Sequence, residues 1–294
     1  MKHLDQKMKE VILNSTNEER IRITKQFKWI GYTQALHTIK KMEDCLTRPK
    51  SHRMPNILLV GDSNNGKTAI LARFVQMYPA YIEKSTDKLI QDVLFIQAPP
   101  EPDEKRFYNT ILDKLFAPYR TSEKIDSRYM RVKSLLLELE VKILIIDEIH
   151  HILAGSPTKQ RLFLNVIKHL SNDLQIALVC SGTKLAFNAI QSDQQLANRF
   201  EPRILKRWSN DTDLRRLLVS FERILPLKKE SNLIENSILT KILTMSDGLI
   251  GEISKILEVS TILAIESGID YITMDILNNI DYISPIDRKK IFKH

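Results

Sequence analysis

A lysine and a threonine, Lys67 and Thr68, end an eight-residue stretch that begins at Gly61 and fits the pattern G-x-x-x-x-G-K-[ST] at every position. Glycines in such a stretch let backbone N–H groups wrap phosphates, and the N-terminus of the following helix adds its positive dipole end. Lys67 would reach the β- and γ-phosphates, and the Thr68 hydroxyl would ligate Mg²⁺. The stretch therefore predicts a phosphate loop for a nucleoside triphosphate, made of Gly61, Asp62, Ser63, Asn64, Asn65, Gly66, Lys67 and Thr68.

A second pair of reactive residues, Asp147 and Glu148, follows an apolar run at residues 143–146. An apolar strand that ends on Asp-Glu downstream of a phosphate loop is typical of a magnesium and water site. Asp147 would hold the Mg²⁺ through water, and Glu148 would orient or deprotonate the attacking water. Both residues stand at the carboxyl end of a predicted parallel strand, where ligands bind in open α/β sheets. The two motifs together predict triphosphate hydrolysis.

Two histidines, His150 and His151, come directly after this pair. We find no Glu or Cys at ligand spacing from them, and the magnesium site already has its oxygen ligands. We therefore expect structural or supporting roles for both histidines rather than a metal site of their own.

The elements that position these residues follow from the apolar periodicity. Short apolar runs predict buried strands at residues 57–60, 93–96, 143–146 and 176–180, with a fifth strand at 203–208. Helical patterns separate the strands, so the sheet should be parallel and flanked by helices. Only helical patterns follow Asn210, at residues 213–225, 235–246, 250–267 and 273–280. We expect an α/β fold with a small all-helical lid domain.

The division into domains follows from the same patterns. Residues 1–56 should form a basic, helical N-terminal extension, residues 57–208 the α/β base, and residues 209–294 the helical lid. Within the extension, Thr16 and Glu19 have the spacing of a capping box at the start of a helix that we expect to run to Phe27.

Composition excludes several classes of protein. The chain has 294 residues, of which 43% are hydrophobic and 27% charged, and no apolar run long enough to span a membrane. The start, MKHLDQKMKE, lacks an apolar signal core, so we do not expect secretion. Cys45 and Cys180 form no C-x-x-C pair, which favours reduced cytoplasmic thiols and no zinc site.

The net charge of +8 permits a polyanionic partner. Residues 1–56 carry twelve Lys and Arg against six Asp and Glu, so most of the excess precedes the phosphate loop. A solvated basic face explains this excess equally well.

Stretches on both sides of the motifs resemble the TniB/TnsC transposition ATPases, a family of AAA+ proteins. The resemblance covers roughly residues 16–260. The phosphate loop and the Asp-Glu strand are generic, whereas the flanking stretches are specific to the family. These stretches are WIGY from Trp29, RMPNILLVGDSNNGKT from Arg53, IDEIHHILAG from Ile146, QRLFLNVIKHLSNDL from Gln160, LANRFEP from Leu196 and LKRWSNDTDLRRLLVSFERILPL from Leu205.

The resemblance implies an ATP- and Mg²⁺-dependent AAA+ ATPase that regulates DNA transposition of a bacterial mobile element. Such proteins assemble as homo-oligomers, in rings or helical filaments, on double-stranded target DNA. They recruit a DDE-type transposase and a TniQ-like targeting protein, which implies a cytoplasmic, nucleoid-associated protein. Two alternatives stay open: a helicase-loader-type ATPase of the IstB/DnaC kind, and a non-hydrolysing scaffold that holds ATP on DNA. Glu148 argues against the scaffold, because nothing else explains a carboxylate there.

The resemblance also implies further site residues. Ser181 and Thr183 end the strand beside Asp147, at the sensor-1 location, although Thr183 could equally cap the next helix. Arg199 and Arg203 lie where AAA+ proteins carry an arginine finger that acts on a neighbouring subunit. In the sensor-2 region the usual arginine aligns near Ser254, which leaves the adjacent Lys255 as the candidate.

Two more groups of residues complete the expected sites. The cluster Trp29, Ile30 and Tyr32 matches the adenine-side segment of the family, and a simple core contact is its alternative. A basic segment follows the second strand, where DNA-binding AAA+ proteins often carry an insertion that faces the central channel. We expect nearly sequence-independent phosphate contacts from this segment, because no recognition helix is evident. Its basic residues are Lys105, Arg106, Arg120, Lys124, Arg128 and Arg131.

Overall fold

The computed structural model describes residues 1–26, 28–192 and 194–290, and the chain divides into two compact units. The sheet unit comprises Gln34–Ser63 and Lys67–Leu205. The helical unit comprises Met1–Thr33, Asn64–Gly66 and Lys206–His294. Three residues of the phosphate loop thus group with the helices that follow the sheet in sequence. The division expected at residues 56 and 208 stays a prediction.

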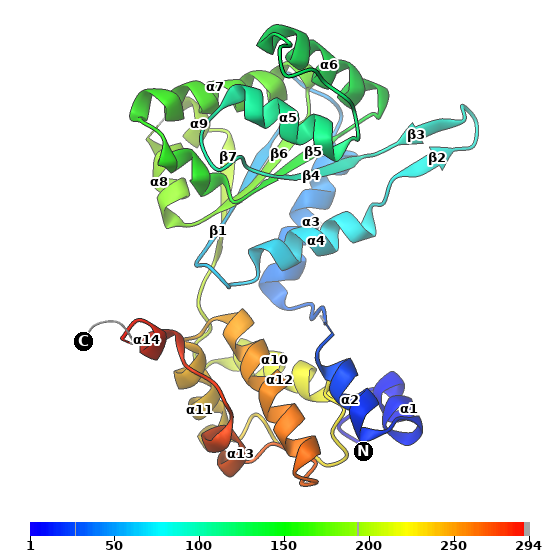
Figure 1. The fold of residues 1–294 in the computed structure, drawn as a ribbon, viewed down its shortest axis with the longest axis vertical. Helices are drawn as coiled ribbons and strands as arrows, with labels where there is room; N and C mark the ends of the chain where they lie inside the picture. Colours follow the sequence, from blue (N-terminus) through cyan, green and yellow to red (C-terminus); the bar gives the residue numbers. More distant parts are fainter. Residues whose placement is uncertain (27, 193, 291–294) are drawn as a thin grey trace. The chain divides into compact units, whose positions relative to one another are not determined.

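The sheet unit is built on a five-stranded parallel sheet in the order β4-β5-β6-β1-β7 (Figure 1). Its strands are β1 (Asn56–Gly61), β4 (Val93–Gln97), β5 (Ile143–Asp147), β6 (Ala177–Gly182) and β7 (Phe200–Leu205). The parallel five-stranded sheet is therefore confirmed. The fifth strand begins at Phe200, three residues before the predicted start at residue 203. It lies at the edge of the sheet and buries only Phe200 and Leu205, so its apolar pattern is too weak to mark where it begins.

Helices cover both faces of this sheet, with α5 to α8 on one face and α3 and α4 on the other (Figure 1). Alternate strand residues such as Leu58 and Val60 pack in one apolar core with α5 to α8. The elements are α3 (Thr33–Thr47), α4 (Lys67–Met77), α5 (Glu104–Lys114), α6 (Ile125–Glu138), the 3₁₀ helix η1 (Ile149–Ala154), α7 (Pro157–Leu174), α8 (Lys184–Gln191) and α9 (Gln194–Ala197). Both cysteines of the chain, Cys45 and Cys180, are free and buried in this unit.

A short antiparallel ribbon of β2 (Tyr81–Glu83) and β3 (Lys88–Ile90) extends from the sheet unit between α4 and β4 (Figure 1). The sequence analysis does not predict it, because each strand has only three residues and too little periodicity to detect.

The helical unit combines two N-terminal helices with the C-terminal ones. It contains α1 (Gln6–Asn14), α2 (Asn17–Thr24), α10 (Thr212–Ile224), α11 (Asn236–Ser246), α12 (Ile250–Glu266), α13 (Met274–Asn279) and α14 (Pro285–Arg288). The predicted capping box of Thr16 and Glu19 is present at the start of α2. The expected end of that helix at Phe27 lies outside the described residues.

A buried ion pair joins α2 to the C-terminal part of the helical unit. The Arg20 guanidinium is fully buried, contacts the Asp270 carboxylate and donates to the Pro226 carbonyl at 2.6 and 2.9 Å.

Among the described residues, no helix has the length and apolar character that crossing a membrane requires.

Candidate functional site

Hydroxyl and carboxylate oxygens meet at the carboxyl edge of the sheet. The Thr68 Oγ1 donates a 2.7 Å hydrogen bond to Asp147 Oδ2, and the Ser181 hydroxyl donates to the other carboxylate oxygen of Asp147. Strand pairing explains this meeting, because Ile146 of β5 lies opposite Cys180 of β6 and the next residue of each strand is the polar one. Oxygens of these kinds are the ligands that Mg²⁺ prefers, so the residues fit the predicted ion.

The Lys67 ammonium lies inside the phosphate loop. Its Nζ donates to the Gly61 and Asp62 carbonyl oxygens at 3.0 and 2.8 Å. Burial lowers the pKa of Lys67 below its usual value, against the opposing attraction of Glu148 and Asp147. Backbone carbonyls are weak partners for a cation, so a phosphate group would be the stronger partner for this ammonium.

The Glu148 carboxylate is half-buried beside His150, whose Nε2 lies 3.1 Å from Glu148 Oε2. The backbone of Glu148 is left-handed, with φ of 58°, and its N–H donates to Asp147 Oδ1 at 2.9 Å. The left-handed turn ends β5 and leads directly into η1. A carboxylate therefore does stand beside the two histidines, and the premise that no Glu lies at ligand spacing is wrong: ligand atoms of Glu148, His150 and His151 lie within 4.8 Å of one another. The structural or supporting roles expected for the histidines stay a prediction.

The Thr183 hydroxyl is buried at the carboxyl end of β6 and has no hydrogen-bond partner within the described ranges. Thr183 occupies the N-cap position of α8, but its side chain makes no capping hydrogen bond. The capping alternative is thus not realised. A buried hydroxyl without a partner is costly, and a ligand oxygen at this edge would satisfy it.

Within the helical unit, the segment that begins α12 holds one residue of the phosphate loop. The Gly251 N–H donates to the Asn64 carbonyl at 3.1 Å, and Asn64 Nδ2 donates to Glu252 Oε1 at 3.0 Å. A Cβ on Gly251 would lie 1.9 Å from Asn64 Oδ1, so only glycine permits this approach. The sequence analysis did not predict that Gly251 and Glu252 contact the phosphate loop.

The Glu252 carboxylate is only 5% exposed and is fully hydrogen-bonded. Arg288 donates to its two oxygens at 3.0 and 2.6 Å, and the Tyr282 hydroxyl donates at 2.5 Å. Burial favours the neutral acid, but the hydrogen bonds from Arg288 and Tyr282 outweigh it and hold the pKa of Glu252 below its usual value. A charged residue in the apolar run of α12 is the signal that could have identified this position.

The expected adenine-side residues belong to the helical unit, where Ile30 and Tyr32 pack against its apolar core and Trp29 is half-buried. The Tyr32 ring meets Trp208 edge-on at a centroid distance of 5.1 Å, and a Cβ on Gly66 would lie 3.5 Å from the Tyr32 hydroxyl. Burial raises the pKa of Tyr32 to about 12. Trp208 is an additional aromatic residue beside this segment, and the sequence analysis did not select it.

The expected finger and sensor-2 residues occupy three different settings. Arg199 precedes β7 at the amino edge of the sheet, and its guanidinium donates to Asn172. Arg203 lies within β7, opposite Leu59, and pairs with Glu201. Lys255 pairs with Glu258 at 2.8 Å on the exposed side of α12, so the two charges already satisfy each other.

Four of the six basic residues of this segment are exposed, Lys105 is half-buried and Arg128 is buried. Arg106, Arg120 and Lys124 are exposed, Lys105 donates to the Thr121 carbonyl at 2.9 Å, and Arg131 pairs with Glu123 at 3.1 Å.

Arg128 is fully buried, which overturns its expected role as a surface cation. Its guanidinium donates to Asn109, to the Arg120 and Thr121 carbonyls and to the Glu123 carbonyl. The reason is that α6 turns this position inward, under the loop before the helix. Arg128 therefore holds the loop in place.

Comparison with known families identifies a matching family. The sequence matches the family described as Bacterial TniB protein over residues 20–210. A search of curated proteins finds no match.

Solved structures with a similar fold include ORC and Cdc6 proteins. The ORC1 protein of Aeropyrum pernix, in complex with DNA, aligns with a TM-score of 0.62 and 15% identity over 92% of this chain and 69% of that chain. Cdc6p from Pyrobaculum aerophilum aligns with a TM-score of 0.60 and 16% identity over 85% of this chain and 67% of that chain. Drosophila ORC bound to DNA aligns with a TM-score of 0.58 and 13% identity over 90% of this chain and 65% of that chain. At these identities the likeness shows the fold alone, which is that of AAA+ ATPases, as predicted.

Proposed function

The chain belongs to the TniB family, and on that premise we propose that it is an ATPase that regulates DNA transposition. It binds ATP with Mg²⁺ and assembles as a homo-oligomer, a ring or helical filament, on double-stranded target DNA. It then recruits a DDE-type transposase and a TniQ-like targeting protein. These partners and a cytoplasmic, nucleoid-associated location in bacteria rest on the family resemblance.

The observation that carries the ATPase proposal is the hydrogen bond between Thr68 and Asp147, with Lys67 in the loop beside them. Thr68 and Asp147 would hold a Mg²⁺ that neutralises charge on the β- and γ-phosphates. Lys67 binds the same phosphates, and the Thr183 hydroxyl, which has no partner among the described residues, is available to a phosphate oxygen. Glu148 orients or deprotonates the attacking water.

Support for DNA as the partner comes from charge and from the similar structures. The chain carries a net charge of +8, and Arg106, Arg120 and Lys124 are exposed in one segment of the sheet unit. Two of the structures with this fold were solved on DNA. Backbone phosphates attract such cations regardless of base sequence, so we propose sequence-independent binding to a duplex.

A non-hydrolysing scaffold is the competing function, and the contact between Glu148 and His150 favours it, because it engages the carboxylate that hydrolysis needs. In an ATPase, the carboxylate must leave the imidazole or keep a free oxygen for the water. An ATPase and a scaffold would therefore both bind ATP, but only the ATPase would hydrolyse it.

Measurement of ATP turnover with and without duplex DNA tests the proposal. We expect DNA-stimulated release of phosphate from the wild-type protein, and loss of this release in Glu148→Gln protein that still binds ATP. ATP binding without release of phosphate in the presence of DNA would favour the scaffold.

A further inference from the structure

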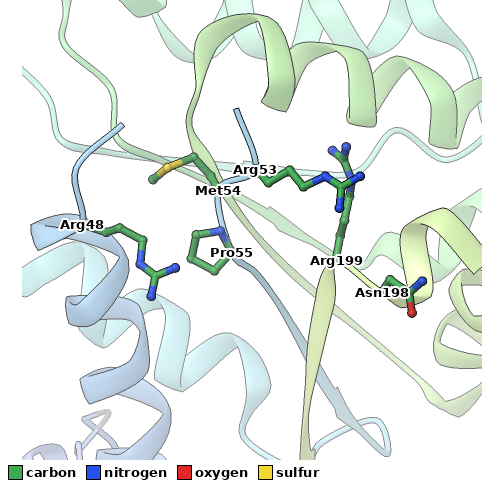
Figure 2. A pocket seen from close by; sticks show the side chains of 6 residues that line it. All are labelled: Arg48, Arg53, Met54, Pro55, Asn198 and Arg199. Atoms are coloured by element: carbon green, nitrogen blue, oxygen red, sulfur yellow. The ribbon is translucent and has the colours of Figure 1, made fainter. Parts of the chain in front are cut away.

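A cavity at the amino edge of the sheet is lined by three arginines, and its lining among the described residues includes no carboxylate. Its volume is about 440 Å³, within the range of small-molecule sites. Figure 2 shows Arg48 after the end of α3, Arg53 in the loop before β1, and Arg199 at the start of β7. The other lining residues are Met54, Pro55 and Asn198. We refer to this cavity as the arginine pocket.

Two of the three guanidinium groups, those of Arg48 and Arg53, have no partner among the described residues. Across residues 1–26, 28–192 and 194–290, the structure gives the side chains of Arg48 and Arg53 no hydrogen bond and no ion pair. Arg199 is half-buried and is oriented by its hydrogen bond to Asn172. Like charges that share one cavity repel, and a bound anion removes that cost. Because one guanidinium can donate to two phosphate oxygens at once, the arginine pocket fits a phosphate group.

The arginine pocket lies at the opposite edge of the sheet from the phosphate loop of its own chain. The Asn56 N–H donates to the Arg199 carbonyl at 3.1 Å, so Arg199 stands beside the first residue of β1. The loop begins at Gly61, at the other end of the same strand. At about 3.3 Å per residue, the strand separates the two by about 17 Å, more than an arginine side chain spans. The phosphate must therefore come from another molecule.

We propose that the arginine pocket binds the terminal phosphates of the ATP that a second copy of the chain holds, with Arg48 and Arg53 acting beside Arg199. This inference rests on the proposed function, because it needs ATP in the loop and copies that associate head to tail. In a head-to-tail interface, one edge of a subunit faces the opposite edge of the next. The proposal also explains Arg53, which opens the family-specific stretch before β1 but takes no part in phosphate binding within its own chain.

A nucleotide is a better match than DNA for this pocket. The cavity is small and concave, whereas duplex DNA presents a long row of phosphates that needs an extended basic surface. The exposed cations Arg106, Arg120 and Lys124 lie together in the segment between β4 and β5 and supply such a surface. A half-buried arginine held by Asn172 is suited to one phosphate group at a fixed position.

Single substitutions test the proposal through DNA-stimulated ATP turnover. We expect Arg53→Ala and Arg48→Ala each to lower kcat at least about tenfold, because cations in contact with the transferred phosphate act in the transition state. Arg53→Lys should recover only part of the loss, since an ammonium cannot bind two oxygens at once. Arg216→Ala removes an exposed arginine of α10 and serves as the matched control. Thermal unfolding confirms that each variant is folded.

Mixing two variants of reduced turnover separates a contribution of Arg53 to the neighbour's site from a structural one. Glu148→Gln protein keeps an intact arginine pocket. Arg53→Ala protein keeps an intact phosphate loop and an intact Glu148. At equal amounts, about one interface in four pairs the two intact halves, so turnover should return on mixing. If turnover of Arg53→Ala protein stays lost on mixing, Arg53 acts within its own chain and the proposal is wrong.

Direct titration with tripolyphosphate gives a second measurement that needs no assembly. In Lys67→Ala protein the loop lacks its lysine, and calorimetry should still detect tripolyphosphate binding. This binding should weaken at least about tenfold when Arg53→Ala is added, because the pocket loses a charge-assisted pair of hydrogen bonds.

The failures of the two proposals are distinguishable. A wild-type protein without ATP turnover contradicts the proposed function itself. If the wild type is active while both Arg48→Ala and Arg53→Ala stay within about twofold of it, the arginine pocket is not a phosphate site and the ATPase stands. If these variants lose DNA affinity but keep full turnover once bound, the pocket holds DNA phosphates and our inference is overturned.

Discussion

Asn64 of the phosphate loop donates a 3.0 Å hydrogen bond to Glu252, the buried carboxylate at the start of α12. Glu252 is in turn fixed by Arg288 and Tyr282. Asn64 has a left-handed backbone, with φ of 61°, so its conformation depends on contacts that hold it. Glu252 is therefore a positioning residue for the loop, and the C-terminal segment acts on the loop through it.

Substitution of Glu252 by Gln should weaken ATP binding without removing it. The neutral amide keeps the shape but loses the charge-assisted bonds to Arg288, so Asn64 is less well held. We expect ATP affinity to fall roughly 5- to 30-fold, the equivalent of about 1–2 kcal/mol. Equilibrium binding of a fluorescent ATP analogue measures this change. Glu266→Gln, at the exposed end of the same helix, is the control, and equal affinities in the two variants would contradict the positioning function.

Lys67→Ala and Glu148→Gln should separate ATP binding from hydrolysis. Lys67→Ala removes the ammonium that contacts the phosphates, so ATP binding should be abolished. Glu148→Gln leaves Thr68 and Asp147 in place, so ATP should bind and trap the assembled state. Equilibrium dialysis with ATP, together with phosphate release, distinguishes the two variants. Normal turnover in Glu148→Gln protein would show that the Glu148 carboxylate does not act on the attacking water.

The phosphate loop could be predicted from sequence because its residues are contiguous and the pattern restricts each position. The contact of Asn64 with Glu252 could not, because the two residues are 188 positions apart and no local pattern connects them. Burial of Arg128 was also not evident, since a basic residue on a helix is usually exposed. The carbonyl groups that make this burial favourable come from the irregular loop before the helix, which periodicity cannot describe.

The expected finger predicts complementation between two inactive proteins. Arg199 lies at the opposite edge of the sheet from its own loop, so it can complete only a neighbour's site. Lys67→Ala and Arg199→Ala proteins should each be inactive alone, and some turnover should return when they are mixed. Phosphate release at several mixing ratios measures this effect. If Arg199→Ala protein hydrolyses ATP normally by itself, Arg203 becomes the next candidate.

The buried pair of Arg20 and Asp270 should dominate the stability of the helical unit. Asp270→Ala leaves the Arg20 guanidinium buried with only carbonyl and amide partners, which should cost about 3–5 kcal/mol of unfolding free energy. Urea denaturation without nucleotide measures the loss. Asp213→Ala breaks an exposed pair with Arg216 and should change the unfolding free energy by no more than about 1 kcal/mol. Equal losses in the two variants would contradict this assignment.

Removal of charge from the basic segment should change how DNA affinity depends on salt. Each phosphate contact contributes roughly 0.9 to the slope of log affinity against log salt, because binding releases condensed counterions. We expect neutralisation of Lys105, Arg106, Arg120 and Lys124 to flatten this slope and leave ATP binding intact. Arg128 is excluded, since its substitution would unfold the loop that it supports.

Titration of a labelled duplex at several salt concentrations provides the slope for each protein. The matched control neutralises Arg216 and Lys229, two exposed cations of the helical unit, and should leave the slope unchanged. A slope that stays at the wild-type value when the basic segment is neutralised would place the DNA contact elsewhere. The basic residues before Pro55 would then be the next set to neutralise, because they carry most of the remaining excess charge.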